Sequence, residues 1–125
     1  MSENINFLVK FSNFLADEAR TISMKYFKKK IKISSKNKKE FDPVTIADIA
    51  IQKKLNKIIE NSYPSHSIIG EEESNVKFSD YEWCIDPIDG TKSFIQGIPL
   101  WGTLISLAKN GRIILGLADM PALDE

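Results

Sequence analysis

The chain has 125 residues, and its 17 Lys and Arg residues balance its 17 Asp and Glu residues at zero formal net charge. This length suits one small domain, and a hydrophobic content of 42% is ordinary for a soluble globular protein. The basic stretch 25–40 lacks the aromatic platform or helix-turn-helix pattern that would favour nucleic-acid binding. The sequence contains no run of about 18 apolar residues and therefore predicts no membrane span. The N-terminus lacks the pattern of a signal peptide.

Cys84 is the one cysteine, so no internal disulfide can form within the chain. This fits a reducing compartment, and we expect a cytoplasmic protein with no membrane and no nucleic-acid partner. Cys84 stands in an apolar, strand-like segment and is expected to be a small buried hydrophobe. His66 follows a Pro-Ser loop and is expected at the surface.

The first half of the chain predicts two helices with a strand between them. Residues 4–28 carry apolar side chains at helical spacing, and the aromatic stripe of Phe7, Phe11 and Phe14 is expected in the core. Alternation in 30–35 predicts a strand. A second helix follows in 42–63, is ended by Pro64, and has Thr45 and Asp48 as a possible capping box. Its expected buried stripe consists of Ala47, Ile51, Leu55 and Ile58.

The second half predicts strands. Residues 67–70 and 81–87 are short apolar strands, and 89–96 can form a short helix before Gly97. Two apolar strands around Asn110-Gly111 predict a hairpin, because this dipeptide favours the tight turns that join antiparallel strands. Two helices followed by strands predict an α+β fold, with two N-terminal helices packed on a largely antiparallel sheet.

Acidic residues follow two of the predicted strands. Residues 71–73 are all glutamate and come after the strand 67–70, while Asp86 and Asp89 lie at and just after the end of the strand that follows. Clustered carboxylates repel one another unless a cation neutralises them, and hard oxygen ligands without a His or Cys cluster favour Mg²⁺, Mn²⁺ or Ca²⁺. Taken separately, the Asp-Pro-Ile-Asp-Gly segment is also consistent with a simple turn, and the glutamates with a solvated loop.

The residues after Asp89 suit a phosphate. Gly90 allows close backbone approach, Thr91 offers a hydroxyl, and their N–H groups would lie at the start of a helix, where anions bind. A metal cluster beside such an anion site predicts metal-assisted phosphoryl transfer to water.

Three segments together resemble the inositol monophosphatase family of Mg²⁺-dependent, lithium-sensitive phosphatases. They are "DPVTIAD" at 42–48, "IIGEEES" at 68–74 and "WCIDPIDGTKSFIQGIPLWGTLI" at 83–105. The resemblance covers most of the chain, and "DPIDGT" after "GEE" is a specific signature. It implies the first half of a layered sugar-phosphatase-type fold, with Mg²⁺ as cofactor.

The resemblance also implies a role for each matching residue. Glu71, Asp86, the carbonyl of Ile88 and Asp89 match the metal ligands. Thr91 and Glu71 match the pair that orients the attacking water, so Glu71, Asp89 and Thr91 form the expected catalytic group. The N–H groups of Gly90 and Thr91 match the phosphate cradle. The supporting positions in the family match Asp42, Thr45 and Glu72.

The stretch after Thr91 looks closer to the histidinol-phosphate phosphatase branch than to the inositol branch. We therefore expect hydrolysis of a small phosphomonoester, with histidinol phosphate favoured and inositol 1-phosphate second. The family is about twice as long as this chain and supplies a further metal-binding Asp in its second half. Residues 1–125 are thus expected to be the N-terminal portion of such a domain, inactive alone and able to form a homodimer. A non-catalytic cation- or phosphate-binding module and a structural fragment are the alternatives.

Overall fold

The structure is a computed structural model that describes residues 4–30, 43–70 and 74–125, without the side chains of 28–30 and 43–45. The two long helices precede all four strands along the chain. The elements are α1 (Ile5–Lys30), α2 (Pro43–Ser62), β1 (Ser67–Gly70), β2 (Tyr81–Asp89), α3 (Thr91–Gln96), β3 (Gly102–Lys109), β4 (Arg112–Asp119) and the 3₁₀ turn η2 (Pro121–Leu123).

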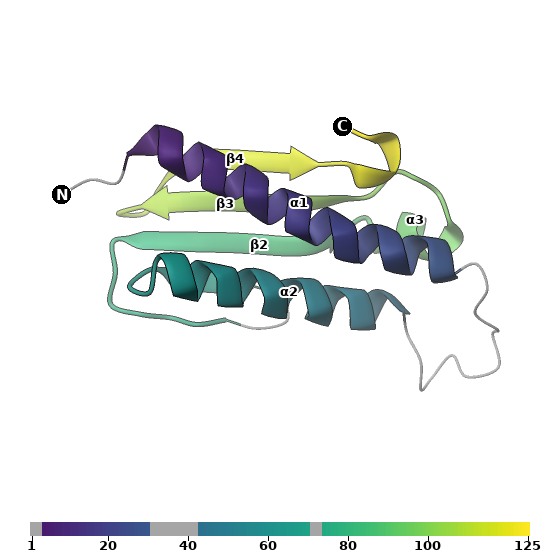
Figure 1. Cartoon of the computed structure of the whole chain (residues 1–125), viewed down its shortest axis with the longest axis horizontal. Coiled ribbons are helices and arrows are strands. Elements are labelled where there is room, and N and C mark those ends of the chain that lie inside the picture. Colours follow the sequence, from purple (N-terminus) through teal and green to yellow (C-terminus); the bar gives the residue numbers. More distant parts are fainter. Residues whose placement is uncertain (1–3, 31–42, 71–73) are drawn as a thin grey trace.

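The four strands form one sheet in the order β1-β2-β3-β4. Figure 1 shows β2, β3 and β4 side by side in this order. β1 pairs with β2 in parallel, whereas β2 with β3 and β3 with β4 are antiparallel. At the β3–β4 turn Asn110 and Gly111 have φ angles of 52° and 79°, the left-handed conformations that a tight hairpin turn requires. The predicted α+β fold with a largely antiparallel sheet is confirmed.

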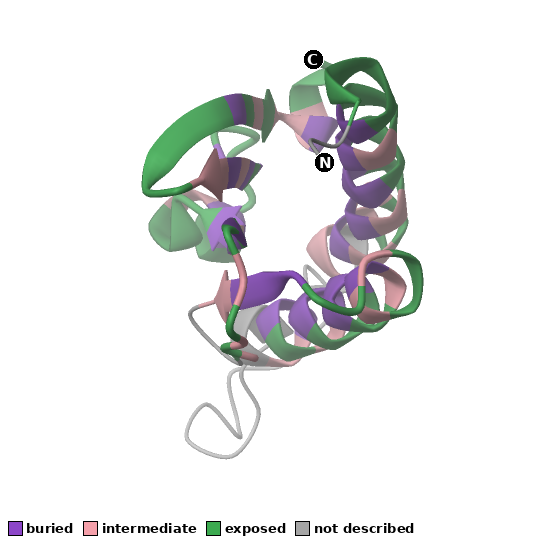
Figure 2. Cartoon of the chain, turned by 90° about the vertical axis from the view of Figure 1, so that its left-hand side faces the viewer, coloured by how far each residue is buried: buried purple, intermediate pink, exposed green. Residues whose placement is uncertain are grey.

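α1 and α2 cover one face of the sheet and bury the core against it (Figures 1 and 2). The strands alternate, so that every second side chain of β2 and β3 points at the helices. The core is built from apolar residues of both layers: Leu8, Leu15 and Ala19 of α1, Ala47, Ile51, Leu55 and Ile59 of α2, and Trp83, Ile85, Ile105 and Leu107 of the sheet. Ile59 is thus buried, where the stripe predicted Ile58.

Several predicted boundaries shift. α1 continues to Lys30, so the strand expected at 30–35 starts inside the helix, and its remaining residues lie outside the described part. α2 begins at Pro43, a favoured first helical residue, which makes Thr45 its third residue. The predicted capping box at Thr45 is therefore wrong. The short helix begins at Thr91 rather than Asp89, because Asp89 still pairs with β3.

The aromatic stripe of α1 is only partly in the core. Phe7 and Phe14 are 67% and 46% exposed, whereas Phe11 packs edge-on against Tyr63 and Trp83. The buried centre of the helix runs through Leu8 and Leu15. Phe7 and Phe14 each precede one of these leucines and are therefore rotated about 100° away from the core.

His66 is buried rather than at the surface, with 1% of its area exposed. Its imidazole is stacked between the rings of Tyr63 and Tyr81, with centroids 4.7 and 4.6 Å away. The indole Nε1–H of Trp83 donates to its Nδ1 at 3.0 Å. The Pro-Ser loop before His66 could not predict this burial, because two of the partners, Tyr81 and Trp83, come from β2.

Cys84 is exposed, contrary to the prediction. Its neighbours Trp83 and Ile85 face the helices, so alternation turns Cys84 to the opposite face of the sheet. The apolar character of this segment predicted a buried Cys84, but the described residues cover only the other face of β2.

Arg20 of α1 ties the helix to the end of β4. Its guanidinium donates to Asp119 at 2.7 Å and to Asp124 at 2.6 Å, and the hydrogen bond with Asp119 is the main reason why its pKa is raised above the usual value. These two ion pairs join residues far apart in the chain, at the end of the sheet where β2 and β4 finish.

We expect the Trp83→Phe substitution to lower the free energy of unfolding by about 1–3 kcal/mol, because it leaves the buried Nδ1 of His66 without this donor. Urea denaturation followed by circular dichroism measures the loss. Glu82→Gln, on the exposed side of the same strand, is the control and should be nearly neutral. An equal effect of both substitutions would contradict the role given to the hydrogen bond.

Candidate metal and phosphate site

Asp86 and Asp89 lie at the edge of the sheet where β1 and β2 end. β1 and β2 are parallel, so their carboxyl ends lie at the same edge, with Gly70 opposite Ile85. β2 then continues through Asp86 to Asp89. Among the other predicted site residues, Asp42, Glu71, Glu72 and the side chain of Thr45 lie outside the described part of the structure.

A bulge in β2 brings Asp86 and Asp89 to the same face. In a regular strand, residues three apart point to opposite faces. Here Asp86 pairs with Leu104 and Asp89 with Gly102, so β2 uses one residue more than β3 over this stretch. Because Leu104 and Gly102 are two apart on β3, their partners share the face of the sheet that lies away from α1 and α2. The bulge thus explains how two aspartates at this spacing can act together.

Pro87 and Thr103 hold the bulge. Pro87 has no N–H, and a proline inside a paired strand is tolerated at a bulge. The carbonyl of Pro87 accepts a hydrogen bond from the buried hydroxyl of Thr103 at 2.8 Å. Sequence reasoning missed Thr103, although Pro87 within the predicted strand was a signal that its pairing is interrupted there.

Gly90 connects the bulge to α3. Its φ of 90° is left-handed, and a Cβ on it would lie 2.9 Å from the carbonyl oxygen of Leu100. Its carbonyl accepts the N–H of Phe94, which is fully buried and packs edge-on against Trp101. The backbone at the start of α3 is therefore fixed by one buried aromatic residue.

The polar groups of the site are accessible to different degrees. The side chain of Ile88 is buried, Asp86 is half-buried, and Asp89, Gly90 and Thr91 are exposed. Carboxylates and a backbone carbonyl are the oxygen donors that Mg²⁺ prefers, so this donor set fits a hard cation. Within the described ranges no three His, Cys, Asp or Glu residues gather as a metal cluster.

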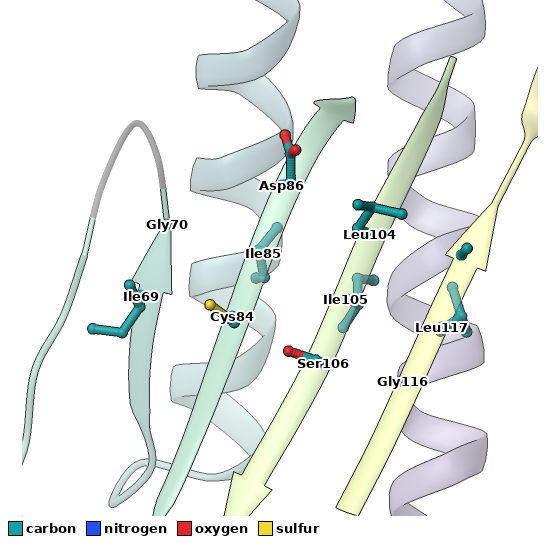
Figure 3. A pocket seen from close by; sticks show the side chains of 11 residues that line it. Ile69, Gly70, Cys84, Ile85, Asp86, Leu104, Ile105, Ser106, Gly116 and Leu117 are labelled. Atoms are coloured by element: carbon teal, nitrogen blue, oxygen red, sulfur yellow. The ribbon is translucent and has the colours of Figure 1, made fainter. Parts of the chain in front are cut away.

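A hollow of about 650 Å³ lies on the face of the sheet opposite the helices (Figure 3). Figure 3 looks onto this face, with Cys84 and Asp86 on β2 and Leu104 and Ser106 on β3. Small residues leave the space: Gly70, Cys84, Ser106, Gly116 and Ala118 belong to its lining. Asp86 is the one charged residue among the described residues of the lining and lies at the end of β2 that carries the site.

The geometry agrees with what comparison with known proteins finds. The sequence model of the inositol monophosphatase family matches residues 5–125. The chain belongs to the inositol monophosphatase family. Over 116 residues it is 47% identical to "Bifunctional phosphatase IMPL2, chloroplastic" of Arabidopsis thaliana, covering 90% of this chain and 33% of the relative. It is 36% identical to a histidinol-phosphatase of Chlorobaculum parvum, covering 89% of this chain and 43% of that relative.

Solved structures give the same family fold. An inositol monophosphatase from Zymomonas mobilis superposes with a TM-score of 0.85 at 31% identity, covering 99% of this chain and 47% of that one. The chain thus spans less than half the length of these family members. Within the described residues, no helix has both the length and the apolar character needed to cross a membrane.

We expect Gly90→Ala to destabilise the chain by more than the roughly 1–2 kcal/mol that a left-handed alanine costs, because the new Cβ also meets the Leu100 carbonyl. Gly97→Ala is the matched control: Gly97 also has a positive φ, of 76°, but no atom lies within 4 Å of the place that its Cβ would take. Thermal unfolding of both variants separates the two effects. Equal losses would show that the close approach to Leu100 adds nothing.

Proposed function

We propose that this chain provides the metal- and phosphate-binding portion of a Mg²⁺-dependent phosphatase that hydrolyses a small phosphomonoester. The observation that carries the proposal is the bulge in β2, which turns Asp86 and Asp89 to one face, immediately before the Gly90-Thr91 turn. Carboxylates gathered beside a turn that suits an anion are typical of metal-assisted attack of water on a phosphate ester. Membership of a family named for a phosphatase supports it.

In this proposal the metal ligands are Glu71, Asp86, the carbonyl of Ile88 and Asp89. When bound, Mg²⁺ would supply positive charge to the phosphate oxygens and lower the pKa of a water. The buried side chain of Ile88 fixes the chain between the two aspartates. Burial of Ile88 therefore holds its carbonyl in a constant position relative to both carboxylates.

The remaining roles concern the phosphate and the water. The N–H groups of Gly90 and Thr91 would hold the phosphate, since the first turn of a helix has N–H groups without intrahelical partners. The hydroxyl of Thr91, with Glu71, would orient the attacking water, while Asp42, Thr45 and Glu72 would support the site. Thr91 is exposed, so a substrate can reach it.

Histidinol phosphate is the substrate that we favour, and inositol 1-phosphate is the second candidate. The relative from Chlorobaculum parvum named histidinol-phosphatase supports the first. The inositol monophosphatase from Zymomonas mobilis supports the second. We propose that the protein is cytoplasmic and forms a homodimer. Sedimentation velocity tests the homodimer.

We also propose that residues 1–125 are the N-terminal portion of a longer domain, because they match less than half of each relative described above. The intact mass of the natural protein tests this. A mass near twice the 14.2 kDa of this chain is the expected result. A mass of 14.2 kDa would contradict it and favour a non-catalytic cation- or phosphate-binding module.

The natural protein should release phosphate from histidinol phosphate only when Mg²⁺ is present. Asp89→Asn should reduce the rate more than about 100-fold, the upper range for residues that only support a metal ligand. Release of phosphate is measured with each of the two candidate substrates.

Glu82→Gln, also on β2 but outside the bulge, should leave the rate unchanged. Full activity of Asp89→Asn would overturn the proposed role of Asp89. Saturable Mg²⁺ binding without any phosphate release from either substrate would reject the enzyme and leave the binding module.

A further inference from the structure

Gln52 is a buried polar residue of α2 that packs on the end of β1. Its side chain is fully buried, and its Nε2 donates to Oδ1 of Asn56, one turn later, at 2.9 Å. Its Oε1 is a buried acceptor with no hydrogen-bond donor in the described part of the structure. A buried oxygen left in this way costs free energy, so its presence requires an explanation.

The carboxamide of Gln52 lies directly against Gly70. A Cβ added to Gly70 would lie 2.2 Å from Oε1 and 2.3 Å from Cδ of Gln52, far inside contact distance. Gly70 does not have a positive φ, so its backbone would accept an L-residue. A larger residue at position 70 would therefore require the carboxamide of Gln52 to move.

Gly70 is held from a second side as well. Its N–H donates to the hydroxyl of Ser74 at 3.2 Å, and that hydroxyl donates to the carbonyl of Gly70 at 3.3 Å. Two backbone hydrogen bonds, both 2.8 Å long, join Ile68, two residues before Gly70, to Asn75, the residue after Ser74. The last residue of β1 is thus fixed by its strand partner, by Ser74 and by Gln52.

We propose that Gln52 is a positioning residue, which sets where β1 ends through the close contact of its carboxamide with Gly70. Gly70 pairs with Ile85, the residue before Asp86, so this contact fixes the end of β1 beside a proposed metal ligand. This inference rests on the proposed function, because it gives Gln52 a purpose only if a metal binds beside Asp86. Gln52 itself is not proposed to touch metal or substrate.

The hydrogen bond from Gln52 to Asn56 explains how a glutamine can position the end of β1. It fixes the rotation of the carboxamide, so that the group stays against the backbone of Gly70. An alanine or another small residue would leave a gap, and the end of β1 could shift. A shift of about 1 Å at a ligand is enough to weaken a preorganised site.

The test is a double-mutant cycle with Gln52→Ala, Gly70→Ala and both together in the natural protein. Metal binding is measured as the Mn²⁺ dissociation constant, from the electron paramagnetic resonance signal of free Mn²⁺. Each single substitution should weaken binding about 10- to 100-fold, the range for residues that orient metal ligands. The double variant should bind better than Gly70→Ala, because removing the carboxamide makes room for the new Cβ.

Leu8→Ala is the control for general loss of stability. Leu8 is buried in the first half of α1, and its truncation should lower the melting temperature without changing the Mn²⁺ dissociation constant. Unchanged Mn²⁺ binding in Gln52→Ala, with a lowered melting temperature, would show a structural role only and overturn the inference.

The two proposals fail in different ways. If the wild-type protein binds Mn²⁺ but releases no phosphate, the proposed reaction is wrong, while the Mn²⁺ cycle still decides the role of Gln52. If the wild-type protein binds no Mn²⁺, both proposals are rejected. If phosphate release depends on Mg²⁺ and Gln52→Ala needs no more Mg²⁺ for half-maximal rate than wild type, only the inference about Gln52 is rejected.

Discussion

The hydrogen bond between the Thr103 hydroxyl and the Pro87 carbonyl, within the bulge of β2, is the contact on which the site depends. Without the extra residue that the bulge accommodates, Asp86 and Asp89 would face opposite sides of the sheet. With it they share a face, and Gly90 can turn the chain directly into α3. One irregular pairing thus converts a segment with two carboxylates into the start of an oxygen-donor site.

The rest of the fold keeps this irregularity in place. α1 and α2 press on one face of the sheet, where the buried side chains of Trp83, Ile85 and Ile88 anchor β2 before and within the bulge. At the far end of β2, His66 and its aromatic neighbours hold the start of β1 against the same strand. β1 and β2 are therefore fixed relative to each other along their whole pairing. That is the condition for residues at their carboxyl ends to act together.

The two faces of the sheet are used differently. The helix-covered face is built from large apolar side chains, whereas the opposite face presents Cys84, Ser106 and Gly116 in one row across three strands. This row of small residues creates the hollow, and Asp86 stands at its end near the site (Figure 3). The carboxylate side of the site therefore opens on the face that the two long helices do not cover.

Local patterns in the sequence were enough for the two helices, the hairpin, the fold class and the family. Helical spacing, the Asn110-Gly111 turn and the "DPIDGT" segment are each contained in a few neighbouring residues. The structure of these segments depends mainly on local backbone preference and on which side chains become buried. The same patterns predicted the wrong environment for Phe7, His66 and Cys84. For these residues the environment depends on which distant segments pack nearby, and for Cys84 on which face of the sheet the helices cover.

Only the tertiary structure decided how the predicted site residues are oriented. The sequence showed Asp86 and Asp89 three apart, but pairing with β3 turned both to one face, because Leu104 and Gly102 lie only two apart. The contact of Gln52 with Gly70 likewise joins α2 to β1 across 18 positions of the chain. What the sequence determined was therefore the set of chemical groups and the elements that carry them. Their relative orientation came from long-range pairing and packing, which no short pattern contains.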